Sequence, residues 1–260
     1  MKNRQQQEQV EALHQVLLHW YAHHARSFGW REQHHNPYIV LVSEVMLQQT
    51  QTARVEQKLP QFLALFPSPA ELAQADNATI IRAWQGMGYN NRALRLRDCA
   101  RVLMERHGGD VPRTMEELLA LPGIGRYTAS AILVFAYAQD LPVVDVNIQR
   151  VYSRVFQQMA TTAEMLPEKE IHDISTYVYP SGSSSAWHQA VMDLSALYCS
   201  ARAPRCATCP VGELCSSAST MKEEKKQKRP EPSWRGEPNR IWRGRIVEIL
   251  RSVERGDWIT

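Results

Sequence analysis

Four of the five cysteines in this 260-residue chain fall within seventeen residues, at Cys199, Cys206, Cys209 and Cys215. The polar N-terminal stretch MKNRQQQEQV is unlike a signal peptide. We therefore expect a cytoplasmic protein, in which clustered cysteines bind a metal more often than they form disulfides. Four thiolates around one point suit either a tetrahedral zinc ion or an iron–sulfur cluster, and the spacing alone favours zinc. Cys99 stands apart and is expected to fill the core.

The spacing of apolar residues predicts an all-α fold. The run YIVLVSEVML at 38–47 contains many β-branched residues. We still expect a helix there, because the run continues to residue 57 without a turn residue and lacks an alternating partner strand. Residues 30–37 are expected to form a loop. The remaining helices are expected at 4–25, 52–65, 69–74, 77–84, 90–107, 114–120, 126–138, 145–157, 167–177 and 184–199.

The last forty or so residues differ from the rest in composition. Basic residues outnumber acidic ones by four in 220–260, whereas acidic residues exceed basic ones by one in 1–219. Charge and proline in 221–240 predict a linker, followed by a helix at 241–254. This helix either starts a small DNA-binding appendage or is a solvated terminal helix. The sequence contains no run of eighteen apolar residues, so we expect no membrane partner.

The segment LPGIGRYTA at 121–129 places Gly123 and Gly125 between two expected helices. Free N–H groups at the start of the second helix can bind a phosphate oxygen, which favours a helix-hairpin-helix over an ordinary turn. Separately, a stretch rich in arginine at 82–106 forms either a phosphate-binding face or a solvated helix face. These arginines are Arg82, Arg92, Arg95, Arg97, Arg101 and Arg106.

Two carboxylates are candidates for chemistry. Glu44 lies inside the apolar run. If its side chain is buried, its pKa is raised and it can act as a general acid. If the side chain is exposed, Glu44 is an ordinary residue on the polar face of the helix. Asp145 precedes an expected helix. It is there either a simple N-cap or an anion placed beside a developing positive charge.

The order of these motifs resembles that of one family. SEVMLQQTQ, GMGYNNRA, LPGIGRYTASAI, VVDVNIQRV and HQAVMDLSALYC, with three further cysteines, look like the adenine-DNA glycosylases of the MutY type. These belong to the helix-hairpin-helix, iron–sulfur branch of DNA repair glycosylases. The resemblance covers about residues 13–216. It implies a six-helix barrel with the helix-hairpin-helix at 31–148 and a cluster lobe from 1–30 and 149–218, followed by a basic linker and terminal helix at 219–260.

The resemblance implies a role for each matching residue. Glu44 would protonate the adenine ring, Asp145 would face the sugar cation, and Asn147 would orient Asp145 or water. Tyr127 stands where strand-cleaving relatives carry a lysine, so strand cleavage is not expected. The four cysteines would hold a [4Fe-4S] cluster, with a role in structure and DNA binding. The residues expected beside the extruded base, in the base stack and at a phosphate are, in that order, Arg31 and Gln189; Leu47, Gln49 and Tyr89; and Gly123 and Gly125.

The implied activity is that of a monofunctional hydrolase of base excision repair, which removes adenine mispaired with 8-oxoguanine or guanine. Its partner would be double-stranded DNA with a mismatched or damaged base pair, bound by a monomer that in a prokaryote associates with the nucleoid. The alternatives are a thymine or uracil mismatch glycosylase acting opposite guanine, a non-enzymatic DNA-lesion binding protein and a zinc-bound adaptor. SEVMLQQTQ favours adenine, and a mere lesion binder would lack Glu44 or Asp145.

The chain departs from the family pattern in two respects. Val146 stands where the family more often has glycine, which would shift the pocket. About forty residues follow the cysteines, too few for the C-terminal domain that usually recognises 8-oxoguanine. The chain is then either a fragment or finds its mismatch without that domain. In the second case we expect a preference for 8-oxoguanine of at most about a hundredfold.

Overall fold

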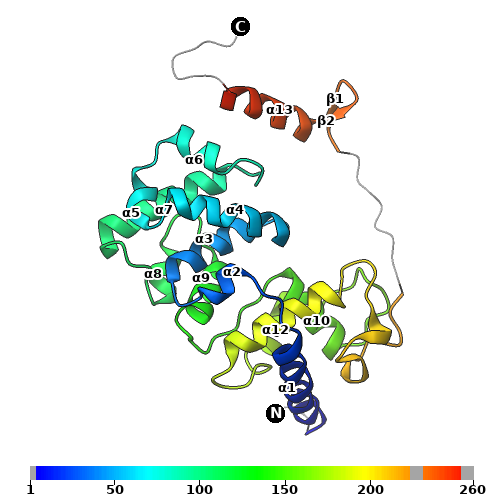
Figure 1. The fold of residues 1–260 in the computed structure, drawn as a ribbon. Helices are drawn as coiled ribbons and strands as arrows, with labels where there is room; N and C mark the ends of the chain where they lie inside the picture. The colour runs from blue at the N-terminus through cyan, green and yellow to red at the C-terminus, as the bar shows by residue number, and fades with distance from the viewer. Residues whose placement is uncertain (1–3, 223–230, 253–260) are drawn as a thin grey trace.

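The structure, a computed structural model, describes residues 4–222 and 231–252 and is almost entirely helical (Figure 1), which confirms the all-α class. The basic run at 223–230 and the terminal residues 253–260 lie outside the described residues. The described helices and 3-10 turns are α1 (Arg4–His24), α2 (Gly29–Glu32), α3 (Pro37–Leu47), α4 (Thr52–Leu65), α5 (Pro69–Gln74), α6 (Asn77–Ala83), α7 (Asn91–His107), α8 (Met115–Leu119), α9 (Arg126–Phe135), α10 (Val146–Phe156), α11 (Glu168–Ser175), α12 (Ser184–Leu197), η1 (Cys206–Thr208), η2 (Gly212–Leu214) and α13 (Asn239–Ser252).

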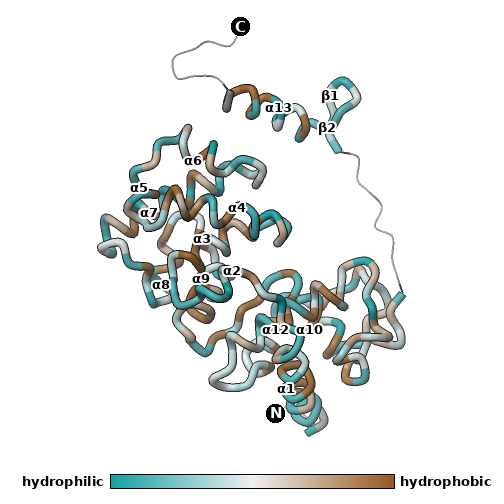
Figure 2. The backbone as a smooth tube through the Cα atoms, viewed as in Figure 1, coloured by the Kyte–Doolittle hydropathy of each residue, from teal (hydrophilic) through white to brown (hydrophobic). Residues whose placement is uncertain are grey.

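Helices α2 to α9 surround one apolar core, whose buried side chains run from Trp30 to Val143. In its interior α3 packs against α9. The side chains of both helices are almost all buried, and Figure 2 shows the apolar stretch of α9 inside this group of helices. A helix that is apolar on all sides is stable only when other elements cover it on all sides, so α3 and α9 form the fixed centre of this half of the molecule.

A second apolar core joins the N-terminal helix to the last third of the described chain. Leu13, Leu17 and Trp20 of α1 pack with buried residues of α10, α11 and α12. Figure 1 shows α1 beside α12, far from the helices that follow it in sequence. The exact residue boundaries of the two lobes stay a prediction. The chain passes from the first core to the second between Val143 and Ile148, in the segment that carries Asp145.

Helix α3 begins and ends for identifiable reasons. Asn36 caps its first turn by accepting hydrogen bonds from the N–H groups of Tyr38 and Ile39, and Pro37 occupies the first position. The helix ends at Leu47, the last residue of the predicted run, and α4 begins at Thr52, as predicted. Between the two helices, Gln49 has a φ of 56°. The reason for the end of α3 lies far along the chain: the Arg92 guanidinium donates to the last carbonyls, at Val45, Met46 and Gln48.

The six arginines do not all point to solvent on one charged face, because several of them are used inside the fold. Arg92 caps the end of α3, Arg97 is buried and pairs with Asp98 and Asn77, and Arg101 binds the carbonyl of Ala73. Three of the six guanidiniums therefore hold helices together. Charge spacing alone could not reveal this, because most of their partners lie more than fifteen residues away.

Two segments expected to be irregular contain regular structure. Residues 30–37 were expected to form a loop, but α2 includes Trp30, whose buried ring stacks on Phe28. Residues 221–240 were expected to form a linker, but within them β1 (Ser233–Trp234) pairs with β2 (Glu237–Pro238) in a short antiparallel hairpin before α13. The expected C-terminal helix is confirmed as α13. In the residues that the structure describes, no helix combines the length and apolar character needed to cross a membrane.

Candidate active site

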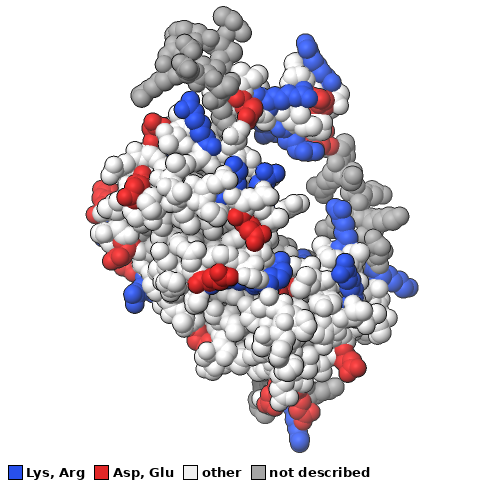
Figure 3. Space-filling view, viewed as in Figure 1, with Lys and Arg blue, Asp and Glu red and all other residues white. Residues whose placement is uncertain are grey.

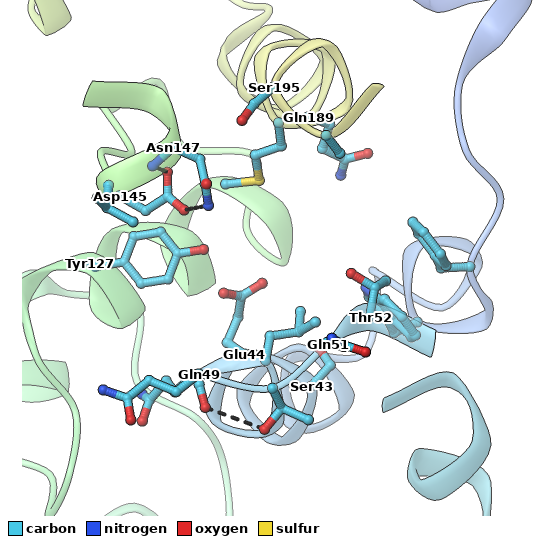
Figure 4. A pocket seen from close by; sticks show the side chains of 18 of the residues that line it. Ser43, Glu44, Gln49, Gln51, Thr52, Tyr127, Asp145, Asn147, Gln189 and Ser195 are labelled. Atoms are coloured by element: carbon cyan, nitrogen blue, oxygen red, sulfur yellow. Dashed lines mark hydrogen bonds between the residues drawn. The ribbon is translucent and has the colours of Figure 1, made fainter. Parts of the chain in front are cut away.

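A large cleft opens between the two apolar cores. Its walls come from α2, α3, α9, α10, α12 and the loop at 48–51, and its volume is about 1180 Å³. Pockets for small molecules hold about 300–1,000 Å³, so a cleft of this size suits part of a larger ligand. Figure 4 shows Glu44, Tyr127, Asp145 and Asn147 converging on the cleft from different helices.

Glu44 projects from α3 into the floor of this cleft and is only 6% exposed. Burial raises its pKa from 4.5 to about 7; the nearby Tyr127 hydroxyl opposes the rise, the charge of Asp145 adds to it, and Arg31 opposes it. One carboxyl oxygen, Oε2, has no hydrogen-bond partner among the described residues. Of the two interpretations of Glu44, the structure therefore supports the buried acid, which keeps a proton near neutral pH.

Asp145 stands at the N-terminus of α10 and has a different environment. Its Oδ1 accepts hydrogen bonds from the N–H groups of Asn147 at 2.9 Å and Ile148 at 2.7 Å, and its Oδ2 accepts one from the Asn147 side chain at 2.7 Å. Acceptance of three N–H bonds is the pattern of an ionised carboxylate. Asp145 is thus a helix cap, and it also lines the cleft, so the two interpretations of this residue are not exclusive.

Tyr127 lies between the two carboxyl groups at the start of α9 (Figure 4). Burial raises the pKa of its phenol well above 10, and the charges of Glu44 and Asp145 raise it further. The phenol is therefore neutral. Asn147 extends the network toward the cysteine-rich segment, since it also accepts from Arg150 at 3.1 Å, and Arg150 donates to the carbonyl of Cys199 at 2.8 Å.

Arg31 and Gln189 line the opposite wall of the cleft. The Arg31 guanidinium donates to both oxygens of Asp193 at 2.9 Å, and the Tyr21 hydroxyl donates to the side-chain oxygen of Gln189, Oε1, at 2.7 Å. That bond uses only the amide oxygen, which leaves the amide nitrogen of Gln189 to donate to a ligand in the cleft. Both side chains are thus held in place by residues of the second core.

Asp193 is a site residue that the sequence did not single out. It is fully buried; burial would raise its pKa, but hydrogen bonds and the charges of Arg31 and Arg26 outweigh that effect and hold the pKa below its usual value. Its only sequence signal is a single acidic residue in an apolar stretch, VMDL, which is the signal that Glu44 gave.

Three further predicted residues lie along the rim of the cleft. Leu47 ends α3, Gln49 follows it with a φ of 56°, and Tyr89 has a φ of 47° and is 68% exposed. A positive φ is rare outside glycine and commonly marks functional loops, so the backbones of Gln49 and Tyr89 are typical of such loops.

The comparisons with known proteins agree with this geometry. The chain matches the HhH-GPD superfamily of base excision DNA repair proteins over residues 42–174. It is 36% identical over 238 residues to the adenine DNA glycosylase of Mycobacterium tuberculosis H37Rv, which is 92% of this chain and 78% of that relative. The human adenine DNA glycosylase is 36% identical over 224 residues, covering 83% of this chain and 41% of that protein. The chain belongs to the adenine DNA glycosylase family.

Two solved structures share the fold of this glycosylase. A thermostable thymine-DNA glycosylase covers 82% of this chain and 98% of its own, with a TM-score of 0.76 and 27% identity. An endonuclease III–DNA complex has a TM-score of 0.70 at 22% identity and shows the shared fold. The family and the enzyme class that the motifs implied, a hydrolase of N-glycosidic bonds in base excision repair, are confirmed.

The two glycines of the hairpin differ in this glycosylase. Gly123 has a φ of 80°, and a side chain there would meet the Arg95 Cβ at 3.0 Å. Gly125 precedes α9 without a side-chain cap and with open space around it. The first N–H groups of α9 are therefore uncapped by side chains, which is the requirement for holding a phosphate.

The four clustered cysteines and Arg154 line one small pocket. All are free thiols, and Arg154 donates to the Cys199 sulfur at 3.4 Å. Burial raises the pKa of the Cys209 thiol to about 11, so its thiolate needs a nearby positive charge. Within the described residues no three His, Cys, Asp or Glu side chains are already arranged as a metal site. The donor set, four thiols and nothing else, suits a group that binds sulfur.

Proposed function

We propose that the protein is a monofunctional glycosylase that hydrolyses the N-glycosidic bond of adenine mispaired with 8-oxoguanine or guanine in duplex DNA. The observation that carries the proposal is the unequal pair of carboxyl groups in the cleft. Glu44 is buried with a pKa of about 7, whereas Asp145 is surrounded by three N–H donors. Hydrolysis of a glycosidic bond needs one protonated and one ionised carboxyl group at the same pH.

Glu44 and Asp145 act on opposite ends of the bond that breaks. Adenine anion is a poor leaving group, so Glu44 donates its proton to the ring and adenine departs neutral. The sugar then develops oxocarbenium character, which the negative charge of Asp145 stabilises. Asn147 holds the Asp145 carboxylate in place by its 2.7 Å hydrogen bond. Water completes the reaction at the sugar and leaves an abasic site.

Tyr127 limits the reaction to base removal. A strand-cleaving glycosylase forms an imine through an amine, and a neutral phenol cannot form that bond. Tyr127 instead lies against Glu44 and helps to separate it from Asp145. The product is therefore an abasic strand that stays intact until it is treated with alkali.

DNA binding is proposed to extrude the adenine into the cleft, at a cost of a few kcal/mol that is smaller at a mismatch. Gln189 and Arg31 would border the base, and Leu47, Gln49 and Tyr89 would enter the stack it leaves. Figure 3 shows Lys and Arg side chains on both sides of the hollow beneath α13, which favours the approach of a polyanion.

We infer that the four cysteines hold a [4Fe-4S] cluster, because four thiols around one pocket match its ligand set and the chain belongs to this family. The cluster would supply structural support and DNA contact near Ser200 and Ala201, which line the cleft. The test is metal analysis after anaerobic purification. We expect about four iron and four sulfide per chain with broad visible absorbance; stoichiometric zinc without iron contradicts the inference.

The second candidate is a thymine or uracil mismatch glycosylase, which the 27% identity to a thymine-DNA glycosylase favours. Duplexes with adenine, thymine or uracil opposite guanine or 8-oxoguanine separate the two. We expect free adenine from the adenine duplexes, alkali-labile strands and no imine trapped by borohydride. Release of thymine or uracil alone would transfer the function to the second candidate, and binding without any release would leave a lesion-binding protein.

A further inference from the structure

The backbone that leads to Asp145 is fastened to α12 and to the turn before it. Tyr179 donates to the carbonyl of Asp140 at 3.0 Å, and Ser184 donates to the carbonyl of Leu141 at 2.6 Å. The last contact is the closest to the site: the N–H of Val143 donates to Nε2 of His188 at 3.1 Å. The stretch from Asp140 to Asp145, here called the connector, carries the chain from the first core to the second.

The partners of His188 fix the protonation of its ring. A backbone N–H can only donate, so Nε2 must be the bare nitrogen. The other nitrogen, Nδ1, lies 2.7 Å from the carbonyl of Ser184, which can only accept, so Nδ1 carries the proton. The ring is 0% exposed, and burial lowers its pKa to about 4, although the Ser184 carbonyl and the charge of Asp140 oppose that change. At neutral pH the ring is therefore a single neutral tautomer.

An apolar side chain could not replace this arrangement. Val143 is 0% exposed, so without an acceptor its N–H would be buried and unsatisfied. The connector would then relax toward another acceptor or toward water. Asp145 lies only two residues after Val143, so a shift of the Val143 backbone moves the carboxylate that faces the sugar.

We propose that His188 is a positioning residue for base excision, which sets Asp145 in register with Gln189. Gln189 follows His188 on α12 and lines the cleft, while Asp145 follows the segment that His188 holds. One buried ring thus links the side chain beside the base to the carboxylate beside the sugar. The inference rests on the proposed roles of Asp145 and Gln189, and it adds a residue that touches neither the base nor the sugar.

Two conservative substitutions separate this role from simple core filling. The amide of His188→Gln reaches the place of Nε2 and can still accept from Val143, whereas the amide of His188→Asn reaches only the place of Nδ1 and Ser184. We expect His188→Asn to lower the single-turnover rate of adenine release at least about tenfold, while its Kd for mismatched DNA stays within about threefold of the wild-type value. The rate of His188→Gln should stay within about threefold of the wild-type rate. Tyr179→Phe removes the hydrogen bond to Asp140 from the same connector and should leave the rate unchanged.

The proposal is overturned if the Asn and Gln variants have equal rates per folded molecule, or if they lose only thermal stability or DNA affinity. Nitrogen NMR of the wild-type protein at pH 7 tests the geometry without any activity. We expect a proton on Nδ1 of His188 and none on Nε2; a proton on Nε2, or on both nitrogens, contradicts the proposal even if neither variant folds. Absence of adenine release by the wild type would instead count against the proposed function, and the NMR result would still decide the state of the ring.

Discussion

At the scale of single residues, the main feature of the molecule is a carboxyl group that folding keeps protonated. Glu44 has an ordinary pKa of 4.5 when exposed and about 7 in the fold. Between these values the folded state holds a proton that the unfolded state has lost. Stability therefore falls as pH rises from about 4.5 to about 7, and above that range the ionised carboxylate is a constant cost.

Glu44→Gln should remove this pH dependence, because an amide has no proton to lose. We expect the free energy of unfolding of the Gln variant to exceed that of the wild type by roughly 2–3 kcal/mol at pH 8 and to approach it below pH 4.5. Urea unfolding at several pH values measures the difference. Glu32→Gln, an exposed residue at the end of α2, is the control and should change stability little at either pH. A difference between the Glu44 variant and the wild type that does not change with pH would mean that Glu44 is not buried as an acid.

Asp145 has two roles that one substitution separates. Asn caps helices as well as Asp does, so Asp145→Asn should change stability by less than about 1 kcal/mol. The neutral amide cannot stabilise a cation, so the single-turnover rate of adenine release should fall by at least about a hundredfold. Asp76→Asn is the control, because Asp76 caps α6 in the same way at the surface. Equal activity of the two variants would reduce Asp145 to a cap.

At the scale of elements, the helix-hairpin-helix makes a prediction about its two glycines. Gly123→Ala forces an alanine to a φ of 80° and brings its Cβ to 3.0 Å from the Arg95 Cβ, so the hairpin must shift. We expect a loss of about 1–2 kcal/mol in stability and a weaker Kd for duplex DNA. Gly125→Ala is the matched control for stability, since its backbone is extended and no atom lies within 4 Å of the new Cβ. Equal losses of stability in the two variants would contradict the strain expected at Gly123.

Helices could be predicted from local signals where those signals exist. Ser68 with Pro69 marks the start of α5, which is where the sequence predicted it. Asn36 with Pro37 is the same signal at α3, but Pro37 was assigned to the preceding loop, so α3 begins one residue before the predicted run. No local signal marks the end of α3, because no Gly or Pro follows it and its carbonyls are satisfied by Arg92, more than forty residues away. The hairpin at 233–238 was not predicted, because its turn has Arg235 at a φ of 49°, where Asn or Asp is the usual sequence signal.

The site was predictable in part for the same reason. Sequence motifs supplied Glu44 and Asp145 and left open whether each was functional or merely structural. Burial of Glu44 depends on α9 packing against α3, with Tyr127 and Asp145 nearby, and no local pattern records these long-range contacts. Asp193, which holds Arg31 in the cleft, gave only a weak signal and was missed.

At the scale of the whole molecule, the elements around two separate apolar cores contribute charged side chains to one cleft. The described part of the C-terminal segment reaches back to the first core, where Gln85 donates to Glu248 of α13 at 2.6 Å. Figure 3 shows Lys and Arg side chains around the hollow beneath α13. We regard this segment as a source of general affinity for DNA rather than of mismatch preference.

Removal of residues 223–260 tests that view, since both cores lie before residue 223. We expect the plot of log binding constant against log salt to become flatter by roughly two to four units, because each lost phosphate contact changes the slope by about one. The ratio of rates on 8-oxoguanine and guanine duplexes should stay constant within about threefold. A collapse of that ratio with an unchanged salt slope would make the segment a mismatch reader.

The central claim, that Glu44 protonates adenine in a DNA duplex, is tested most directly by single-turnover release of free adenine from a duplex with adenine opposite 8-oxoguanine. Wild type and Glu44→Gln are compared at saturating enzyme and pH 7. The account predicts release by the wild type and a rate at least about a thousandfold lower for the Gln variant, with the same Kd for the duplex. A Gln variant that releases adenine within about tenfold of the wild-type rate would contradict it.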